Sequence, residues 1–154
     1  MEKLYFEDLE TLKASKATLE TPLSPSPITV SCIQEYIEIT SDHHASHSDS
    51  RYNLRFGYMD IFVPGFLMPG LAEGFFRRYH EYALHMNRGF SAKPIIPLYP
   101  GNHIRVVDEI LQTKSHPRLV VDNSSPVSIR RKVFNENQDL VYILELDYLV
   151  SRRQ

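Results

Sequence analysis

The hydrophobic pattern of the chain predicts one long helix followed by a sheet. Between residues 65 and 86, apolar side chains recur every three or four positions, at Leu67, Leu71, Phe75, Tyr79, Ala83 and Met86. Pro69 is tolerated only in a first turn, so we expect this helix to begin near Gly65 or Phe66. Strand-like runs follow at 103–111, 118–134 and 140–150. A helix this apolar must be covered by that sheet, which predicts a two-layer α+β domain.

The segments before this helix are less regular. Residues 1–27 combine an acidic, helix-like start with a Ser/Pro-rich stretch whose prolines exclude a helix. Residues 28–39 show a helical period, with Thr29 or Ser31 as the N-terminal cap. Residues 41–60 are rich in His, Ser and Asp and have no clear period. Irregular segments on a rigid scaffold often carry chemistry, so functional residues are expected there.

Composition and charge narrow the class of protein. A chain of 154 residues suggests one domain over residues 1–154, large enough to bury a core without disulfides or metal. Its 17 Lys and Arg against 19 Asp and Glu give a net charge of −2, which argues against a nucleic-acid-binding protein. Cys32 is the single cysteine, and the sequence shows neither a signal peptide nor an apolar run long enough to span a membrane. We therefore expect a cytoplasmic protein.

The polar segment from Thr40 to Asp49 holds the residues best suited to acid–base chemistry. Asp42 and His47 are five residues apart, and a carboxylate beside an imidazole moves protons at neutral pH. The segment resembles the signature of MaoC-like, (R)-specific enoyl-CoA hydratases, in which Gly-Asp-x-Asn-Pro-(Leu/Ile)-His-x-Asp follows a short helix. Asp42 and His47 fall on the catalytic Asp and His of that signature, and Asp49 falls on its last Asp.

Other motifs extend the resemblance over nearly the whole chain. Residues 62–67 are similar to the Ile-(Val/Ala)-His-Gly-Met-Leu turn of that family, with Pro64 in place of its His. Residues 4–9 look like its Phe-Glu-Asp-Leu opening, 99–102 like its Pro-Val-x-x-Gly-Asp segment, and 134–153 like its closing strand. The motifs are short, but their order and spacing are those of the family.

The resemblance implies a single hot-dog domain, in which a long central helix is wrapped by a curved antiparallel β-sheet. It also implies a homodimer whose sheets join edge to edge, with the sites near the interface. The implied reaction is the hydration of trans-2-enoyl thioesters, or the reverse dehydration, without a metal or redox cofactor. The acyl group would be carried by coenzyme A or by an acyl carrier protein.

The resemblance also assigns roles to single residues. Asp42 would accept a proton from the attacking water, and His47 would hold that water and deliver a proton to C2, although this division of labour stays open. The backbone N–H of Gly65 would stabilise the negative charge that develops on the thioester oxygen. Substrate contacts are expected at Asp49, Pro64 and Phe66.

Two other functions remain open at this stage. Ser41, His44 and Ala45 stand where the hydratase signature has Gly, Asn and Pro, and these departures favour a non-catalytic acyl-binding or scaffold protein. Residues 55–60 look like the Arg-Phe-Gly-x-x-Asp of 4-hydroxybenzoyl-CoA-type thioesterases, which would make Asp60 the catalytic carboxylate. A metal site among the His and Asp residues of the polar segment is a weaker alternative, because no second, distant set of ligands is evident.

Overall fold

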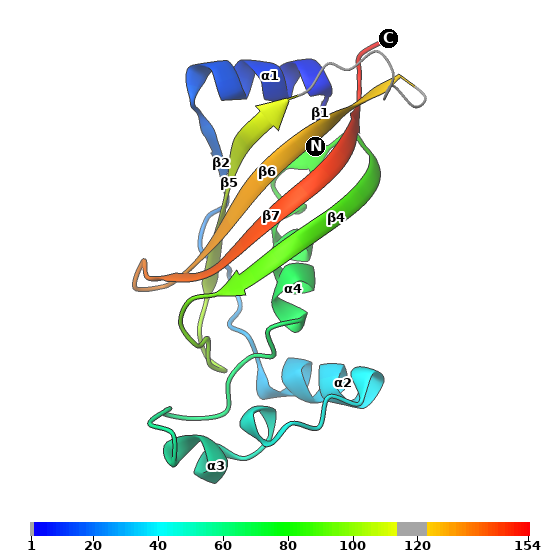
Figure 1. Cartoon of the computed structure of the whole chain (residues 1–154). Helices are drawn as coiled ribbons and strands as arrows, with labels where there is room; N and C mark the ends of the chain where they lie inside the picture. The colour runs from blue at the N-terminus through cyan, green and yellow to red at the C-terminus, as the bar shows by residue number, and fades with distance from the viewer. Residues whose placement is uncertain (1, 114–122) are drawn as a thin grey trace.

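Within residues 2–113 and 123–154, which the computed structural model describes, five strands form one antiparallel sheet (Figure 1). In the order in which they lie side by side, the strands are β2 (Thr18–Glu20), β5 (Ile104–Thr113), β6 (Ser124–Asn135), β7 (Leu140–Ser151) and β4 (Leu84–Pro94). Two short strands, β1 (Lys3–Leu4) and β3 (Glu81–Tyr82), pair in parallel beside it. Strands β2 and β4 are therefore the two edges of the sheet.

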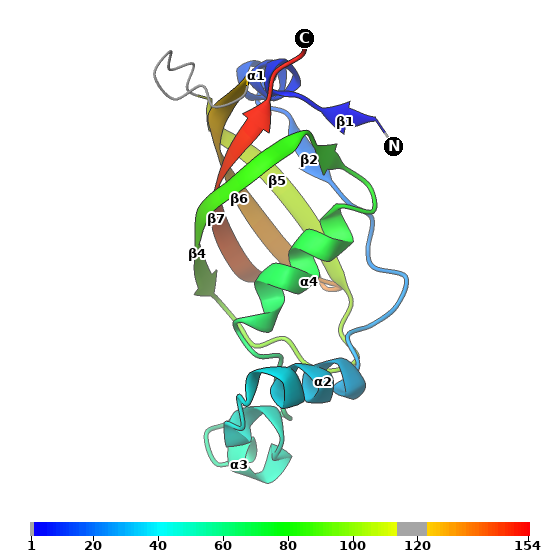
Figure 2. The same ribbon diagram turned by 90° about the vertical axis from the view of Figure 1, so that its right-hand side faces the viewer.

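The helices cover one face of this sheet and lie at its two ends. They are α1 (Phe6–Ser15), α2 (Val30–Thr40), the 3-10 turn η1 (Ala45–His47), α3 (Ser50–Leu54) and α4 (Leu67–Phe76). Figure 2 shows α4 crossing the face of the sheet, with α1 at one end and α2 and α3 beyond the other. The predicted α+β arrangement of helix against sheet is confirmed. None of the described helices is both long and apolar enough to cross a membrane.

The helix predicted over residues 65–86 is much shorter in the structure. Helix α4 begins at Leu67, so that Pro69 lies in its first turn, but it ends at Phe76. Beyond it the backbone turns back and enters the sheet, where Ala83 accepts a hydrogen bond from the amide of Ser151 at 2.8 Å. The second half of the predicted helix was therefore wrong.

The physical reason lies in strand β4. This edge strand is exposed along almost its whole length, so its sequence need not alternate between apolar and polar residues. Without that alternation Met86 of β4 falls by coincidence on a helical spacing with Tyr79, in the turn after α4, and Ala83, just before β4. The helical spacing of apolar residues beyond Phe76 therefore does not indicate a helix.

The other predicted elements match the structure more closely. Helix α2 lies within one or two residues of the predicted 28–39 helix, and its Thr29 hydroxyl accepts from the amide of Cys32 at 3.1 Å. The runs 103–111 and 140–150 are strands β5 and β7. Residues 118–122 of the third run lie outside the described residues. The break predicted at 123–126 is wrong, because β6 already begins at Ser124.

The core lies between α4 and the sheet. Helix α4 contributes four buried side chains, those of Met68, Ala72, Phe75 and Phe76. The sheet contributes alternate residues of its central strands, among them Val106, Ile129, Val133, Leu144 and Val150. Burial of these apolar surfaces is the main force that holds the two layers together.

A charged network is enclosed within this core. Arg131 on β6 and Asp108 on β5 are cross-strand neighbours, both fully buried, and the guanidinium donates two hydrogen bonds of 2.7 Å to the carboxylate. The Tyr82 hydroxyl donates to Asp108 at 2.7 Å, and burial together with this carboxylate raises the pKa of Tyr82 well above its usual value. Glu73 of α4 also accepts from Arg131. The network therefore ties helix α4 to strands β5 and β6.

The two ends of the chain meet at the α1 end of the domain. The guanidinium of Arg153 donates to the carboxylate of Asp8 at 2.8 and 3.0 Å. The guanidinium of Arg152 lies 4.6 Å from the centre of the Phe6 ring. Both termini consequently lie far from α2 and α3 (Figure 1).

We predict that Asp108→Ala lowers the free energy of unfolding by about 3–5 kcal/mol, because it leaves the Arg131 charge buried without its bidentate partner. Urea denaturation measures this loss. Lys132→Ala is the matched control, since Lys132 is the next residue on β6 and pairs with Glu109 at 3.2 Å in a partly exposed bridge. It should cost less than about 1 kcal/mol. Equal losses in the two variants would contradict the prediction.

Candidate active site

One buried amide organises the polar segment 41–60. Asn53 of α3 is 1% exposed, and its side chain donates to the carbonyls of Ser46 at 2.7 Å and Asp60 at 2.8 Å. These two bonds hold η1 and the loop after α3 against each other. Sequence reasoning missed Asn53, because one Asn in a polar segment carries no pattern that separates it from its neighbours.

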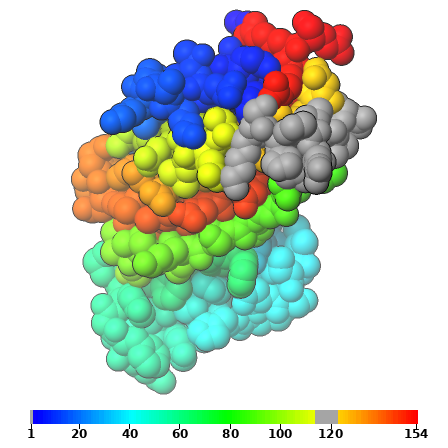
Figure 3. Space-filling model, turned by 45° about the horizontal axis from the view of Figure 1, so that its top comes forward, coloured from blue at the N-terminus to red at the C-terminus, as the bar shows by residue number. Residues whose placement is uncertain are grey.

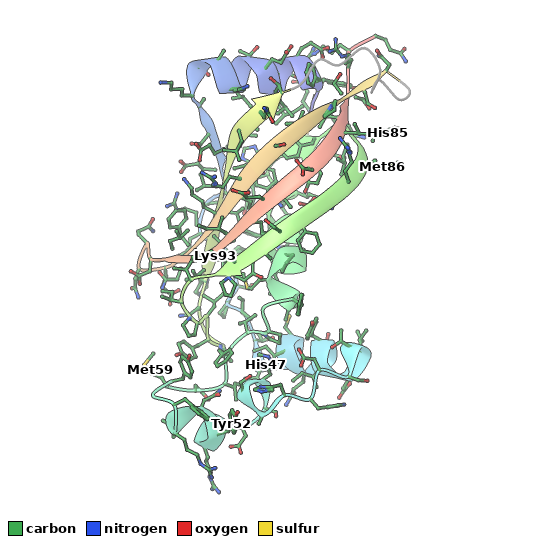
Figure 4. The ribbon with its side chains drawn as sticks, viewed as in Figure 1. His47, Tyr52, Met59, His85, Met86 and Lys93 are labelled. Atoms are coloured by element: carbon green, nitrogen blue, oxygen red, sulfur yellow. The ribbon has the colours of Figure 1, made fainter. Side chains whose placement is uncertain are left out.

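His47 is fixed in both position and tautomer. It is 9% exposed, and Figure 4 shows it between α2 and α3, beyond the end of the sheet. Its Nδ1 lies 2.8 Å from the carbonyl oxygen of Phe62. Because a carbonyl can only accept, Nδ1 carries the hydrogen, and in the neutral ring Nε2 presents a lone pair. The Phe62 ring packs edge-on against the imidazole, with centroids 5.3 Å apart.

Asp42 faces this free nitrogen. Its Oδ2 lies 4.0 Å from His47 Nε2, and its side chain is one-third exposed. That distance is too long for a direct hydrogen bond, but one small molecule can lie within hydrogen-bonding distance of both atoms. Ser41 follows α2 and has a left-handed backbone conformation, at φ 59°. Glycine adopts this conformation most easily, and the resembled signature has Gly at this position. The structure thus brings together Asp42 and His47, as the resemblance implies.

Gly65 lies nearby but on another surface. With Phe62, Met68 and Tyr142 it lines a cavity of about 300 Å³, which we call the apolar cavity. Asp42 and His47 are not part of its lining, and Phe62 connects the two places, because its carbonyl binds His47. The Gly65 carbonyl accepts from the Tyr142 hydroxyl at 2.7 Å, whereas its N–H donates to no acceptor among the described residues.

Among the described residues, the remaining predicted site residues form no hydrogen bond or ion pair with Asp42 or His47. Pro64 is buried next to Gly65, and Phe66 is 79% exposed at the start of α4. Asp49 caps α3, accepting from the amide of Arg51 at 2.9 Å. Asp60 is exposed, and its carboxylate accepts from the amide of the next residue at 2.7 Å. The structural roles of Asp49 and Asp60 are local, and a substrate contact at Asp49, Pro64 or Phe66 stays a prediction.

A metal centre has no support in the side-chain arrangement. Among residues 2–113 and 123–154, no three His, Cys, Asp or Glu side chains come together as a set that could hold a metal ion. The histidines next to His47 make other contacts instead. His44 binds the Ser46 hydroxyl at 2.7 Å and packs edge-on against the Tyr52 ring.

The fold is that of MaoC-like dehydratases and (R)-hydratases. A monoamine oxidase regulatory protein from Archaeoglobus fulgius matches with a TM-score of 0.81 at 16% identity, covering 99% of this chain and 97% of that one. A MaoC-like dehydratase from Rhodospirillum rubrum matches with 0.80 at 15%, covering 98% and 99%. The (R)-hydratase PhaJ1 from Pseudomonas aeruginosa matches with 0.69 at 17%, covering 98% and 88%. No protein-family model and no curated protein matches by sequence. The predicted hot-dog fold is confirmed.

We predict that Asn53→Ala lowers the free energy of unfolding by about 1–3 kcal/mol, because the carbonyl of Asp60 loses its donor and the carbonyl of Ser46 keeps only the amide of Phe62. Hydrogen exchange at the His47 amide should speed up more than exchange in β6, since the loop opens locally. Asn137→Ala in the exposed β6–β7 turn serves as the control and should change neither quantity. An unchanged exchange rate at His47 in Asn53→Ala would show that this amide does not organise the segment.

Proposed function

We propose that the protein hydrates trans-2-enoyl thioesters, or dehydrates 3-hydroxyacyl thioesters, with Asp42 and His47 as the acid–base pair. The carrying observation is the position of the Asp42 carboxylate 4.0 Å from Nε2 of His47, the ring nitrogen that does not bind Phe62. The fold adds support, because structures that share it are described as dehydratases and (R)-hydratases. The sequence motif supplies the same two residues independently.

The pair is suited to activating one water molecule. A water between Oδ2 and Nε2 would donate one hydrogen to each, so that a lone pair of its oxygen is free to attack C3. As the C3–O bond forms, one proton passes from the water to the pair, and the C2=C3 electrons move toward the thioester. Delivery of a proton from the pair to C2 completes the addition and restores the starting state. The addition of water needs no oxidant or reductant, and the proposal includes no metal or redox cofactor.

The thioester oxygen becomes negative during this reaction and requires a hydrogen-bond donor. Pro64 has no N–H, whereas the N–H of Gly65, two residues before α4, has no acceptor among the described residues. The Tyr142 hydroxyl binds the Gly65 carbonyl, which belongs to the next peptide group. We assign the oxyanion contact to Gly65 and the entry of the acyl chain to the apolar cavity beside it.

The carrier of the acyl group would be coenzyme A or an acyl carrier protein, and we propose that the protein works as a homodimer. Strand β4 is an edge strand with 11 residues whose backbone is paired on one side only, by β7. Figure 3 shows it as a green band along the sheet. Its exposed apolar side chains continue into the next segment, at Met86, Phe90, Ile95 and Ile96. Pairing of two β4 edges would cover both the backbone and these side chains.

We predict that Asp42→Ala and His47→Ala each lower the turnover of crotonyl-CoA hydration by about 10²–10⁴. The double variant should be little slower than either single variant, because both side chains act on one water. Loss of enoyl absorbance measures hydration, and release of free thiol would reveal thioester cleavage instead. The thermal unfolding temperature of His47→Ala must also be measured, because the His47 ring is buried.

Asp60→Asn is the control for this experiment, and it should leave hydration nearly unchanged. Near-normal rates in both pair variants would exclude the proposed mechanism. Loss of activity in Asp60→Asn, with Asp42→Ala harmless and thiol released, would identify a thioesterase. A chain that binds acyl thioesters but alters none of them would be a binding protein.

We further predict a particle of twice the chain mass of 17.9 kDa by light scattering at micromolar concentration. Met86→Asp places a charge at the β4 edge and should shift this equilibrium toward the monomer. Ile39→Asp is the matched control, because Ile39 is an exposed apolar residue on α2, far from β4. A monomeric parent protein, or equal effects of both substitutions, would count against pairing through β4.

A further inference from the structure

A second cavity lies further along the seam between α4 and the sheet. It has a volume of about 350 Å³, and we call it the charged cavity, because Glu73, Arg77 and Arg131 take part in its lining. Both cavities are lined by α4, β7 and β4, but the charged cavity uses later residues of α4 and of β7. On α4 the lining passes from Met68 to Glu73, and on β7 from Tyr142 to Tyr148. The seam therefore begins beside Gly65 and ends at a group of charges.

The charge of that group does not balance. Arg131 is already neutralised by the bidentate carboxylate of Asp108, and Glu73 adds a second carboxylate to the same guanidinium. One cation and two carboxylates leave a formal charge of −1, with Arg131 and Asp108 buried and Glu73 one-third exposed. Arg77 on the rim offsets it weakly, because its side chain is 53% exposed and lies 4.0 Å from Glu81 instead. A buried excess charge is costly unless a donor reaches it.

One oxygen of Glu73 is available for such a donor. Oε2 accepts from Arg131 and from the Tyr148 hydroxyl, the latter at 3.1 Å. No donor among the described residues reaches Oε1. The side chain is one-third exposed and lines the charged cavity, so a ligand in that cavity can reach it.

We propose that the charged cavity receives the far end of the acyl chain and that this end carries a hydrogen-bond donor, a hydroxyl or an ammonium group, which binds Glu73. This inference rests on the proposed function, because it takes Gly65 as the place of the thioester. Gly65 and Glu73 are eight residues apart, which corresponds to roughly 12 Å along a helix. An extended carbon chain covers that distance in roughly nine bonds. The preferred substrate is thus a trans-2-enoyl thioester of about ten carbons with a polar terminus.

The experiment compares three coenzyme A thioesters of equal length, trans-2-decenoyl, 10-hydroxy-trans-2-decenoyl and 10-amino-trans-2-decenoyl. With the parent protein, kcat/KM should be about tenfold higher for each substrate with a donor than for the plain chain. Glu73→Leu should abolish both preferences. Glu73→Gln keeps an amide oxygen but no charge, so it should retain the preference for hydroxyl and lose the preference for ammonium. Glu109→Gln, at a partly exposed carboxylate on β5, is the control and should keep all ratios.

Equal or lower kcat/KM for the polar substrates in the parent protein would overturn the inference, and so would ratios that Glu73→Leu leaves unchanged. Circular dichroism of both variants tests whether unfolding causes a lost preference. Glu73→Gln keeps an oxygen that can accept from Arg131, whereas Glu73→Leu does not. If no thioester is hydrated, the proposed function fails separately. Calorimetric binding of saturated 10-hydroxydecanoyl-CoA against decanoyl-CoA then decides the inference, because tenfold tighter binding of the hydroxyl form supports it and equal binding overturns it.

Discussion

The bidentate ion pair between Arg131 and Asp108 fixes the register of the two central strands over which α4 packs. It lies inside the core, where an unpaired charge would cost several kcal/mol, so β5 and β6 cannot shift register without breaking it. Through Glu73 the same guanidinium fixes the position of α4 over the sheet. The seam that holds both cavities therefore owes its shape to a polar contact as well as to apolar packing.

The candidate site is built differently, at the end of the sheet and outside that core. Its rigidity comes from local bonds, those of Asn53 to two carbonyls and of His47 to Phe62. The bond to Phe62 also selects the tautomer of the neutral ring, which leaves Nε2 toward Asp42. Position and tautomer of the ring thus follow from one backbone carbonyl, and Phe62, the residue that carries it, also lines the apolar cavity.

Much of the fold could be predicted from the sequence, for identifiable reasons. Strand β7 alternates cleanly because one of its faces is buried along its length, and α2 has a Thr29 cap that a sequence pattern reveals. Strand β4 could not be predicted, because exposure removes the alternation on which such a prediction depends. The Asp42–His47 pair was visible because both residues lie in one short motif. Asn53 and the Arg131 network were not, because tertiary partners alone distinguish a buried Asn, Arg or Asp from a solvated one.

The contact between the C-terminal segment and α1 has a consequence for how this domain can be tagged or attached to a surface. The bond from Arg153 to Asp8 holds the C-terminal segment against α1, at the pole opposite α2 and α3 (Figures 1 and 2). A tag, an immobilising surface or a second protein fused to either terminus would therefore stand away from the Asp42–His47 pair.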